Sequence, residues 1–214
     1  MKLWSYWRSS CAYRVRIALG LKQLPFEYAA VHLLRAGGQQ HEPGFGAVNP
    51  QRQVPVLELE DGGQTLRLVQ SMAIIEYLDE RFPEPPLLPS TPAERAHVRA
   101  LAELVNSGIQ PLQNTSTFAE LKKHGVAHEP WARSFIERGL HALEQLAAAK
   151  AGAFLFGDRV SLADVYLVPQ LYNARRFGLS LTAFPTLTRA EGSAQALPAF
   201  AAAVPEAQPD AEAT

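Results

Sequence analysis

The side chains best suited to chemistry lie near the N-terminus, in the run Ser9-Ser10-Cys11. An apolar and aromatic stretch precedes this run and apolar residues at helical spacing follow it, so we predict a turn from a strand into a helix. The first amide groups of a helix have no partners within it, and the helix dipole favours an anion there. A thiolate is such an anion, and a serine hydroxyl that donates a hydrogen bond to it lowers the pKa of the thiol. The turn is therefore expected to hold a thiol-bearing small molecule and to use its thiol.

Simpler interpretations of the same three residues stay open. Both serines are good helix caps, and capping alone would account for their position. A lone cysteine usually behaves as a small buried apolar residue, although Cys11 at a helix start could also be reactive.

Two further motifs suit an extended peptide ligand. Gln70-Ser71 begins a second helix after a strand, where an amide and a hydroxyl could receive a carboxylate, or where the serine could only cap. Val54 precedes Pro55, which interrupts the approach to a strand and would leave the Val54 backbone free to pair with a ligand. The sequence does not decide whether this peptide bond is cis.

The elements that must position these motifs form an α/β pattern. Strands over residues 2–7 and 26–31 flank the first helix, which gives a βαβ unit. Two more strands, residues 56–60 and 65–69, are joined by Asp61-Gly62-Gly63, a strong hairpin signal. The sheet is therefore predicted to be mixed and to be covered by the helix that follows it.

A proline-rich connector divides the predicted domains. The run PEPPLLPSTP contains five prolines and cannot continue a helix. We place a first domain at residues 1–83, a linker at 84–92 and an all-helical domain at 93–214. Ser161 and Asp164 match a capping box and are assigned a structural role. The polar, proline-broken residues 205–214 are expected to form a loose tail.

Composition argues against several classes of function. The formal net charge is -1 and no basic block is present, so nucleic acid is not an expected partner. No segment has the roughly 20 apolar residues needed to cross a bilayer, and no signal peptide is evident, so a cytoplasmic protein is expected. Cys11 is the only cysteine, and the six histidines show no metal-ligand spacing, so neither a disulfide nor a metal is expected.

The ordered motifs resemble the zeta class of the glutathione transferases over nearly the whole chain. They are SSCAYRVRIAL, NPQRQVPVL, QSMAIIEYLDE, IQPLQN, GDRVSLADVYLVPQ and NARRF. The resemblance implies a thioredoxin-like domain with a mixed four-stranded sheet, followed by an all-α domain. Tyr13 departs from the pattern, because tryptophan is common at that position.

The resemblance also implies roles for individual residues. Ser9 would support the sulfur of glutathione, with Ser10 and Cys11 adjoining it. Arg8 and Arg176 would meet the carboxylates of the substrate, although an arbitrary arginine is usually only solvated. The remaining positions that would hold glutathione are Gln40, Val54, Gln70, Ser71, Gln110, Asn114, Thr115 and Ser116.

The implied activity is glutathione-dependent isomerisation of 4-maleylacetoacetate to 4-fumarylacetoacetate, a step in tyrosine and phenylalanine catabolism. Sulfur addition would remove the double-bond character that prevents rotation, and elimination would restore it without net redox change. The family is typically dimeric, so a homodimer is expected. The alternatives are maleylpyruvate as substrate, glutathione transfer to α-haloacids, and a non-catalytic interaction module of the same fold.

Overall fold

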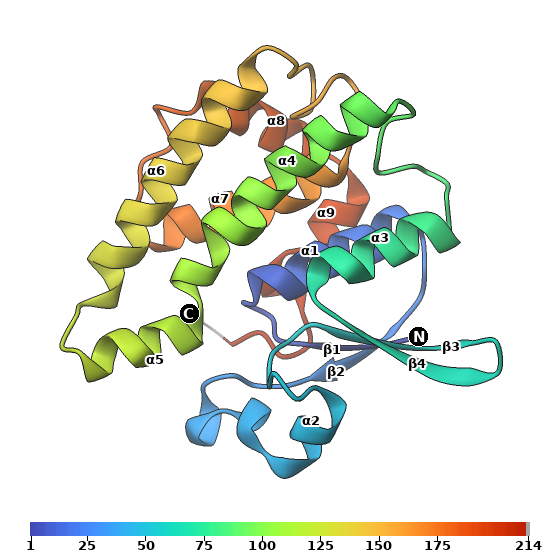
Figure 1. Ribbon diagram of the computed structural model, residues 1–214, viewed down its shortest axis with the longest axis vertical. Coiled ribbons are helices and arrows are strands. Elements are labelled where there is room, and N and C mark those ends of the chain that lie inside the picture. The colour runs from blue at the N-terminus through green and yellow to red at the C-terminus, as the bar shows by residue number, and fades with distance from the viewer. Residues whose placement is uncertain (213–214) are drawn as a thin grey trace. The chain divides into compact units, whose positions relative to one another are not determined.

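A four-stranded mixed sheet organises the N-terminal part of the chain (Figure 1), and the computed structural model describes residues 1–212. Its strands are β1 (Lys2–Ser5), β2 (Glu27–Ala30), β3 (Val56–Asp61) and β4 (Gln64–Val69), in the order β2-β1-β3-β4. β1 and β2 are parallel, whereas β1 with β3 and β3 with β4 are antiparallel. The predicted mixed sheet is confirmed.

The predicted hairpin is formed by β3 and β4, and a turn of two residues, Gly62 and Gly63, joins them. Gly62 and Gly63 both have positive φ, at 57° and 78°. This conformation suits a turn between twisted antiparallel strands and is easily adopted by glycine.

Alternation along β1 separates two packed layers. Leu3 is fully buried, while the neighbouring Trp4 contacts the ring of Phe45 at a centroid distance of 6.0 Å. Phe45 lies on α2 (Pro43–Val48), the short helix on one side of the sheet in Figure 1. On the other side lie α1 (Ser10–Leu21) and α3 (Ser71–Arg81), which pack against each other.

The C-terminal segment folds back onto this first unit. The chain divides into one unit of residues 1–85 with 198–214, and another of residues 86–197. α9 (Pro198–Ala203) packs on α1, where a side chain at Gly20 would meet Ala199. The predicted helical domain over 93–214 includes this segment, whereas residues 198–214 belong to the first unit.

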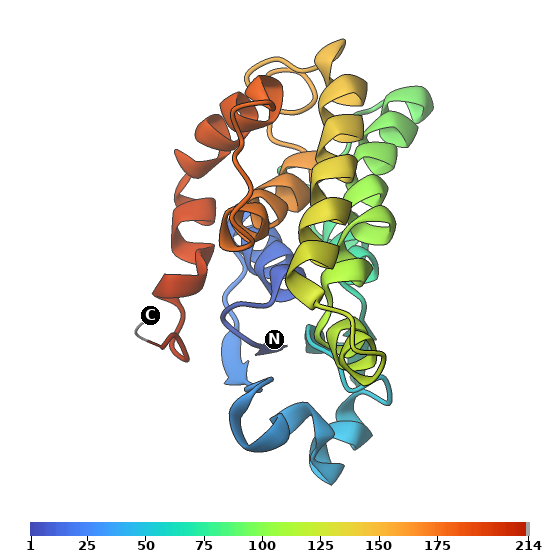
Figure 2. The ribbon, with the colours of Figure 1, turned by 90° about the vertical axis from the view of Figure 1, so that its left-hand side faces the viewer.

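The prediction of a loose tail is wrong for the described part of that tail. η4 (Pro205–Ala207) is a short 3-10 helix, and Asp210 and Glu212 hydrogen-bond to side chains of the first unit. Figure 2 shows the segment running down beside β2. The last two residues of the predicted tail, 213–214, lie outside the described residues.

The second unit is helical, as predicted. α7 is buried along most of its length, and Ser161 and Asp164 form the predicted capping box at its start. None of the helices within residues 1–212 combines the length and apolar character needed to span a membrane. The helices of this unit are α4 (Pro92–Gly108), η3 (Gln110–Gln113), α5 (Thr115–Lys123), α6 (His128–Ala148), α7 (Leu162–Arg176) and α8 (Pro185–Gln195).

Candidate functional site

Ser9 caps α1 and still has a hydrogen to donate. Its Oγ accepts a hydrogen bond from the Ala12 amide at 3.2 Å, and its backbone is extended rather than helical. A serine hydroxyl has one donor and two acceptor positions. Because capping uses only an acceptor position, the half-buried Ser9 can cap the helix and donate to a bound anion at the same time. Ser10, the first residue of α1, is buried.

A buried arginine connects the starts of α1 and α3. Arg14 has no exposed surface, and its Nη1 lies 3.8 Å from Cys11 Sγ and 3.2 Å from Ser71 Oγ. Cys11 is half-buried and Ser71 is buried. The structure thus brings Cys11 and Ser71, two of the predicted residues, to one guanidinium group.

Arg14 itself was not among the predicted site residues. A fixed positive charge near two helix starts adds to the attraction of both dipoles for an anion. The sequence feature that could have indicated Arg14 is its place among apolar residues of α1. It directly precedes Val15, and both Val15 and the nearby Ile17 are fully buried.

Gln70 holds an uncommon backbone conformation just before α3. Its φ is 70° and its ψ is 119°, outside the helical and extended regions. For a residue other than glycine such a conformation costs about 1–3 kcal/mol and is often associated with a functional site. The Gln70 side chain is exposed and donates to Gln51 Oε1 at 2.6 Å. Gln70 makes no side-chain capping hydrogen bond to α3. The first residue of that helix, Ser71, accepts a hydrogen bond from Arg14 through its hydroxyl.

Val54 and Gln40 occupy the remaining predicted positions of the first unit. The Val54-Pro55 peptide bond is cis, and Val54 belongs to an apolar cluster with Tyr6 and Trp7. Gln40 lies on η2 (Gln39–His41), and its side-chain amide donates to Leu33 O at 3.2 Å. The Gln40 side chain is therefore buried against its own loop.

The predicted residues of the second unit lie on η3, α5 and α7. Asn114 caps α5 by accepting from the Thr115 amide at 2.8 Å, while Thr115 and Ser116 are exposed in the first turn and Gln110 begins η3. A buried hydrogen bond of 2.6 Å from Gln113 to Gln170 connects η3 with α7, the helix that ends at Arg176.

The two predicted substrate arginines are positioned differently. Arg176 is exposed and donates to Asn173 Oδ1 at 3.1 Å. Arg8, half-buried in the first unit, stacks over the Trp7 ring at 4.7 Å.

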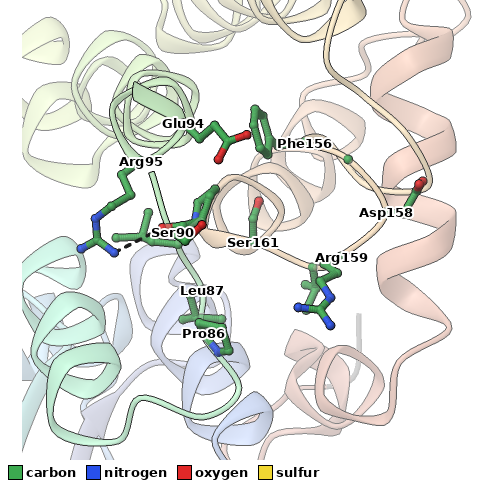
Figure 3. Close-up of a pocket in the computed structure, with 13 residues that line it drawn as sticks. Pro86, Leu87, Ser90, Glu94, Arg95, Phe156, Asp158, Arg159 and Ser161 are labelled. Carbon is green, nitrogen blue, oxygen red and sulfur yellow. Dashed lines mark hydrogen bonds between the residues drawn. The ribbon is translucent and has the colours of Figure 1, made fainter. Parts of the chain in front are cut away.

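The second unit also contains a cavity of about 530 Å³. It is lined by residues 86–90 and 156–161 together with Glu94 and Arg95, and none of the predicted site residues takes part. Figure 3 shows Glu94 beside Phe156, whereas the Arg95 guanidinium is directed towards the Pro89 carbonyl.

Comparison with known proteins settles the family. Residues 8–81 match the glutathione S-transferase N-terminal domain, and residues 129–203 match the corresponding C-terminal domain. The chain belongs to the glutathione S-transferases.

Similar glutathione S-transferases cover almost the full chain. A probable maleylacetoacetate isomerase of Vibrio cholerae is 50% identical over 98% of this chain and 97% of its own length. Maleylacetoacetate isomerase of Pseudomonas aeruginosa is 47% identical, with 98% of both chains covered.

A solved maleylacetoacetate isomerase of Anaeromyxobacter dehalogenans, with glutathione bound in its active site, has a TM-score of 0.91. It is 55% identical, and 99% of this chain and 97% of that chain are covered. A bacterial zeta-class maleyl pyruvate isomerase has a TM-score of 0.92 at 43% identity, with 99% of this chain and 100% of that chain covered. The fold and the zeta-class assignment are therefore confirmed.

Proposed function

We propose that the chain isomerises 4-maleylacetoacetate to 4-fumarylacetoacetate with glutathione as cofactor. The observation that carries the proposal is the near full-length similarity to maleylacetoacetate isomerases of bacteria and animals. The first unit fits glutathione, because the Ser9 hydroxyl retains its donor and Arg14 places positive charge beside Cys11 and Ser71.

When bound, glutathione supplies a sulfur nucleophile that adds reversibly to a conjugated double bond and so permits rotation about it. Ser9 donates a hydrogen bond to that sulfur and favours its ionised form, with Ser10 and Cys11 beside it. The α3 start at Gln70-Ser71 receives a peptide carboxylate, and the Val54 backbone pairs with the extended peptide.

Arg8 and Arg176 are assigned to the dicarboxylate substrate. A guanidinium pairs with a carboxylate through a planar pair of hydrogen bonds and also stabilises negative charge that develops on a carbonyl oxygen. The further positions proposed to hold glutathione are Gln40, Gln110, Asn114, Thr115 and Ser116.

The decisive experiment is an isomerisation assay with maleylacetoacetate and with maleylpyruvate, each with and without glutathione. We expect turnover of maleylacetoacetate only when glutathione is present. Turnover without glutathione would reject the mechanism. Preference for maleylpyruvate would support the second candidate, which the similarity to a maleyl pyruvate isomerase favours.

The proposal extends to assembly and location. A homodimer in the cytoplasm is the arrangement that the resemblance to the zeta class supports. Light scattering at micromolar concentration should give twice the mass of the chain, and a monomer would contradict this part of the proposal.

A further inference from the structure

The C-terminal segment contacts the turn that carries the predicted sulfur-binding serine. The Asp210 carboxylate accepts a hydrogen bond from the Trp7 amide at 3.1 Å through Oδ2. Its other oxygen, Oδ1, accepts from the Tyr28 hydroxyl at 2.6 Å. One carboxylate therefore joins the end of β1 to β2, although Asp210 is 203 residues from Trp7.

The backbone polar groups of this turn are held from two sides. The Ser9 amide donates to Tyr6 O at 3.0 Å, which closes the turn. From α1, the Arg16 guanidinium donates to Trp7 O at 3.0 Å and to Tyr6 O at 3.4 Å. Asp210 satisfies the Trp7 amide, and an amide in so buried a residue would be costly to leave without an acceptor.

Tyr28 is suited to hold Asp210 in place. Burial, together with its hydrogen bond to Asp210, raises the pKa of the Tyr28 hydroxyl well above its usual value. Tyr28 therefore remains a neutral donor over the whole range in which enzymes normally work. The positive charge of Arg16, which also donates to Ser5 Oγ at 3.2 Å, lowers the Tyr28 pKa, but burial outweighs this effect.

We propose that Asp210 is a positioning residue, which fixes the Tyr6–Ser9 turn so that the Ser9 hydroxyl points at the sulfur of glutathione. This inference rests on the proposed function, because it assigns Ser9 to that sulfur. A displacement of about 1 Å in a positioned group is enough to reduce catalysis markedly. The C-terminal segment thereby contributes to the sulfur site through Asp210, although it does not itself contact the sulfur.

The test compares Asp210→Ala with Asp210→Asn in the full chain. Alanine removes both acceptors, whereas an asparagine oxygen can still accept from Trp7 while its amide donates to the Tyr28 oxygen. Glu206→Gln is the matched control, because Glu206 is an exposed carboxylate on η4 of the same segment. Three readouts are needed: hydrogen exchange of the Trp7 amide in the free protein, the thiol pKa of bound glutathione from its thiolate absorbance, and steady-state kinetics.

In Asp210→Ala we expect faster exchange of the Trp7 amide, a thiol pKa about one unit higher and about tenfold lower turnover at neutral pH. The KM for the dicarboxylate should rise as well, because Arg8, a proposed substrate residue, lies within the released turn. The thiol pKa is measured without the dicarboxylate and therefore reports the sulfur site. Asp210→Asn and Glu206→Gln should resemble the wild type. Loss of a negative charge would by itself lower the thiol pKa, so a rise reports positioning rather than charge.

A folded Asp210→Ala protein with wild-type thiol pKa and turnover would overturn the inference, as would an equally impaired Asp210→Asn. If Asp210→Ala does not fold, Asp210→Ser replaces it, since the shorter side chain also fails to bridge the two donors. Failure of the proposed function looks different. A wild-type protein that binds glutathione but does not isomerise would remove that function and leave the thiol pKa comparison valid.

Discussion

At the scale of single residues, the capping role of Ser9 is compatible with the role that we propose for it. Its oxygen accepts from the Ala12 amide, and its hydrogen can still be donated to a ligand. Capping and ligand binding, which are alternatives in the sequence, are compatible in the structure. Their contributions can be separated, because one affects stability and the other affects turnover.

Replacing Ser9 by alanine should therefore have two effects of different size. Loss of the cap should lower the free energy of unfolding by about 1 kcal/mol. Loss of the donor should raise the thiol pKa of bound glutathione by about two units, and the smaller thiolate fraction should lower turnover at neutral pH by about 100-fold. Urea unfolding and the isomerase assay measure the two effects.

Thr91→Ala is the matched control for this substitution. Thr91 caps α4 by accepting from the Glu94 amide at 3.3 Å, and it is not a proposed site residue. It should lose similar stability and keep its turnover. A comparable loss of turnover in Thr91→Ala would show that Ser9 acts only through helix stability.

Asp164 should make stability depend on pH in an unusual direction. Burial raises its pKa to about 6, although the Leu155 and Ser161 amides and the Ser161 hydroxyl donate to it and oppose the rise. An unfolded aspartate titrates near 3.9, so between about pH 4 and pH 6 the folded state binds more protons. The stability that this group contributes is fully present below about pH 4 and is lost as the pH rises through about 6.

The expected loss is about 3 kcal/mol relative to Asp164→Asn, whose amide does not titrate. Urea unfolding of both proteins at several pH values between about 4 and 8 measures it. If the free energy of unfolding changed equally with pH in both proteins, or rose in the wild type relative to Asp164→Asn, the folded-state pKa of Asp164 would not be raised. The hydrogen bonds to its carboxylate would then offset or exceed the effect of burial.

At the scale of elements, two helical glycines have opposite surroundings. A Cβ added at Gly139 of α6 would overlap the side chain of the fully buried Ile109, which directly precedes η3. A Cβ at Gly192 of α8 would have no heavy atom within 4 Å apart from its chain neighbours and the backbone of its own helix. The absence of a side chain at Gly139 allows η3, which begins with the proposed site residue Gln110, to approach α6.

Alanine at these two positions should change stability with opposite sign. Gly192→Ala should raise the free energy of unfolding by about 0.5–1 kcal/mol, because alanine favours the helix. Gly139→Ala should lower it by about 1–3 kcal/mol, since Ile109 must move within a packed core. Thermal unfolding of the two variants provides the comparison, and equal shifts of the same sign would contradict it.

The strands, the hairpin and the α7 cap could be predicted because their signals are local. Alternation, the Gly62-Gly63 turn and the Ser161 to Asp164 spacing each lie within a few neighbouring residues. The contact of Arg14 with Ser71 joins residues 57 positions apart, and no local pattern encodes it. For this reason the predicted site contains Ser71 and Cys11 and omits the arginine that joins them.

At the scale of the whole molecule, the return of the C-terminal segment to the first unit was not predicted. The polar, proline-broken composition of residues 205–214 is typical of a loose tail. Its order comes from distant partners, such as the Trp7 amide and the Tyr28 hydroxyl for Asp210. The composition of a segment indicates its local conformational preference. It does not show which hydrogen-bond partners other parts of the chain provide.

Ending the chain after Leu197 should destabilise the first unit. The truncation uncovers the α1 surface that α9 covers, and it removes the Ala203 carbonyl to which Arg16 Nε donates at 3.2 Å. We expect a loss of about 3–5 kcal/mol, since it combines exposed apolar surface with buried donors that lose their acceptors.

Hydrogen exchange of α1 and β1 amides measures this loss locally, with α6 amides of the second unit as the internal control. Unchanged protection in α1 would show that the returning segment contributes nothing to stability. Equal loss of protection in α6 would show that the effect is not confined to the first unit.

The same connectivity sets an order of events during synthesis. A ribosome makes β1, α1 and their partner strands first, yet the segment that completes this unit emerges only after all of residues 86–197. The helical unit can therefore finish folding while α1 of the first unit is not yet covered by α9. In a nascent chain, the α1 surface that α9 covers should therefore stay exposed, and open to chaperone binding, until α9 has left the ribosomal exit tunnel.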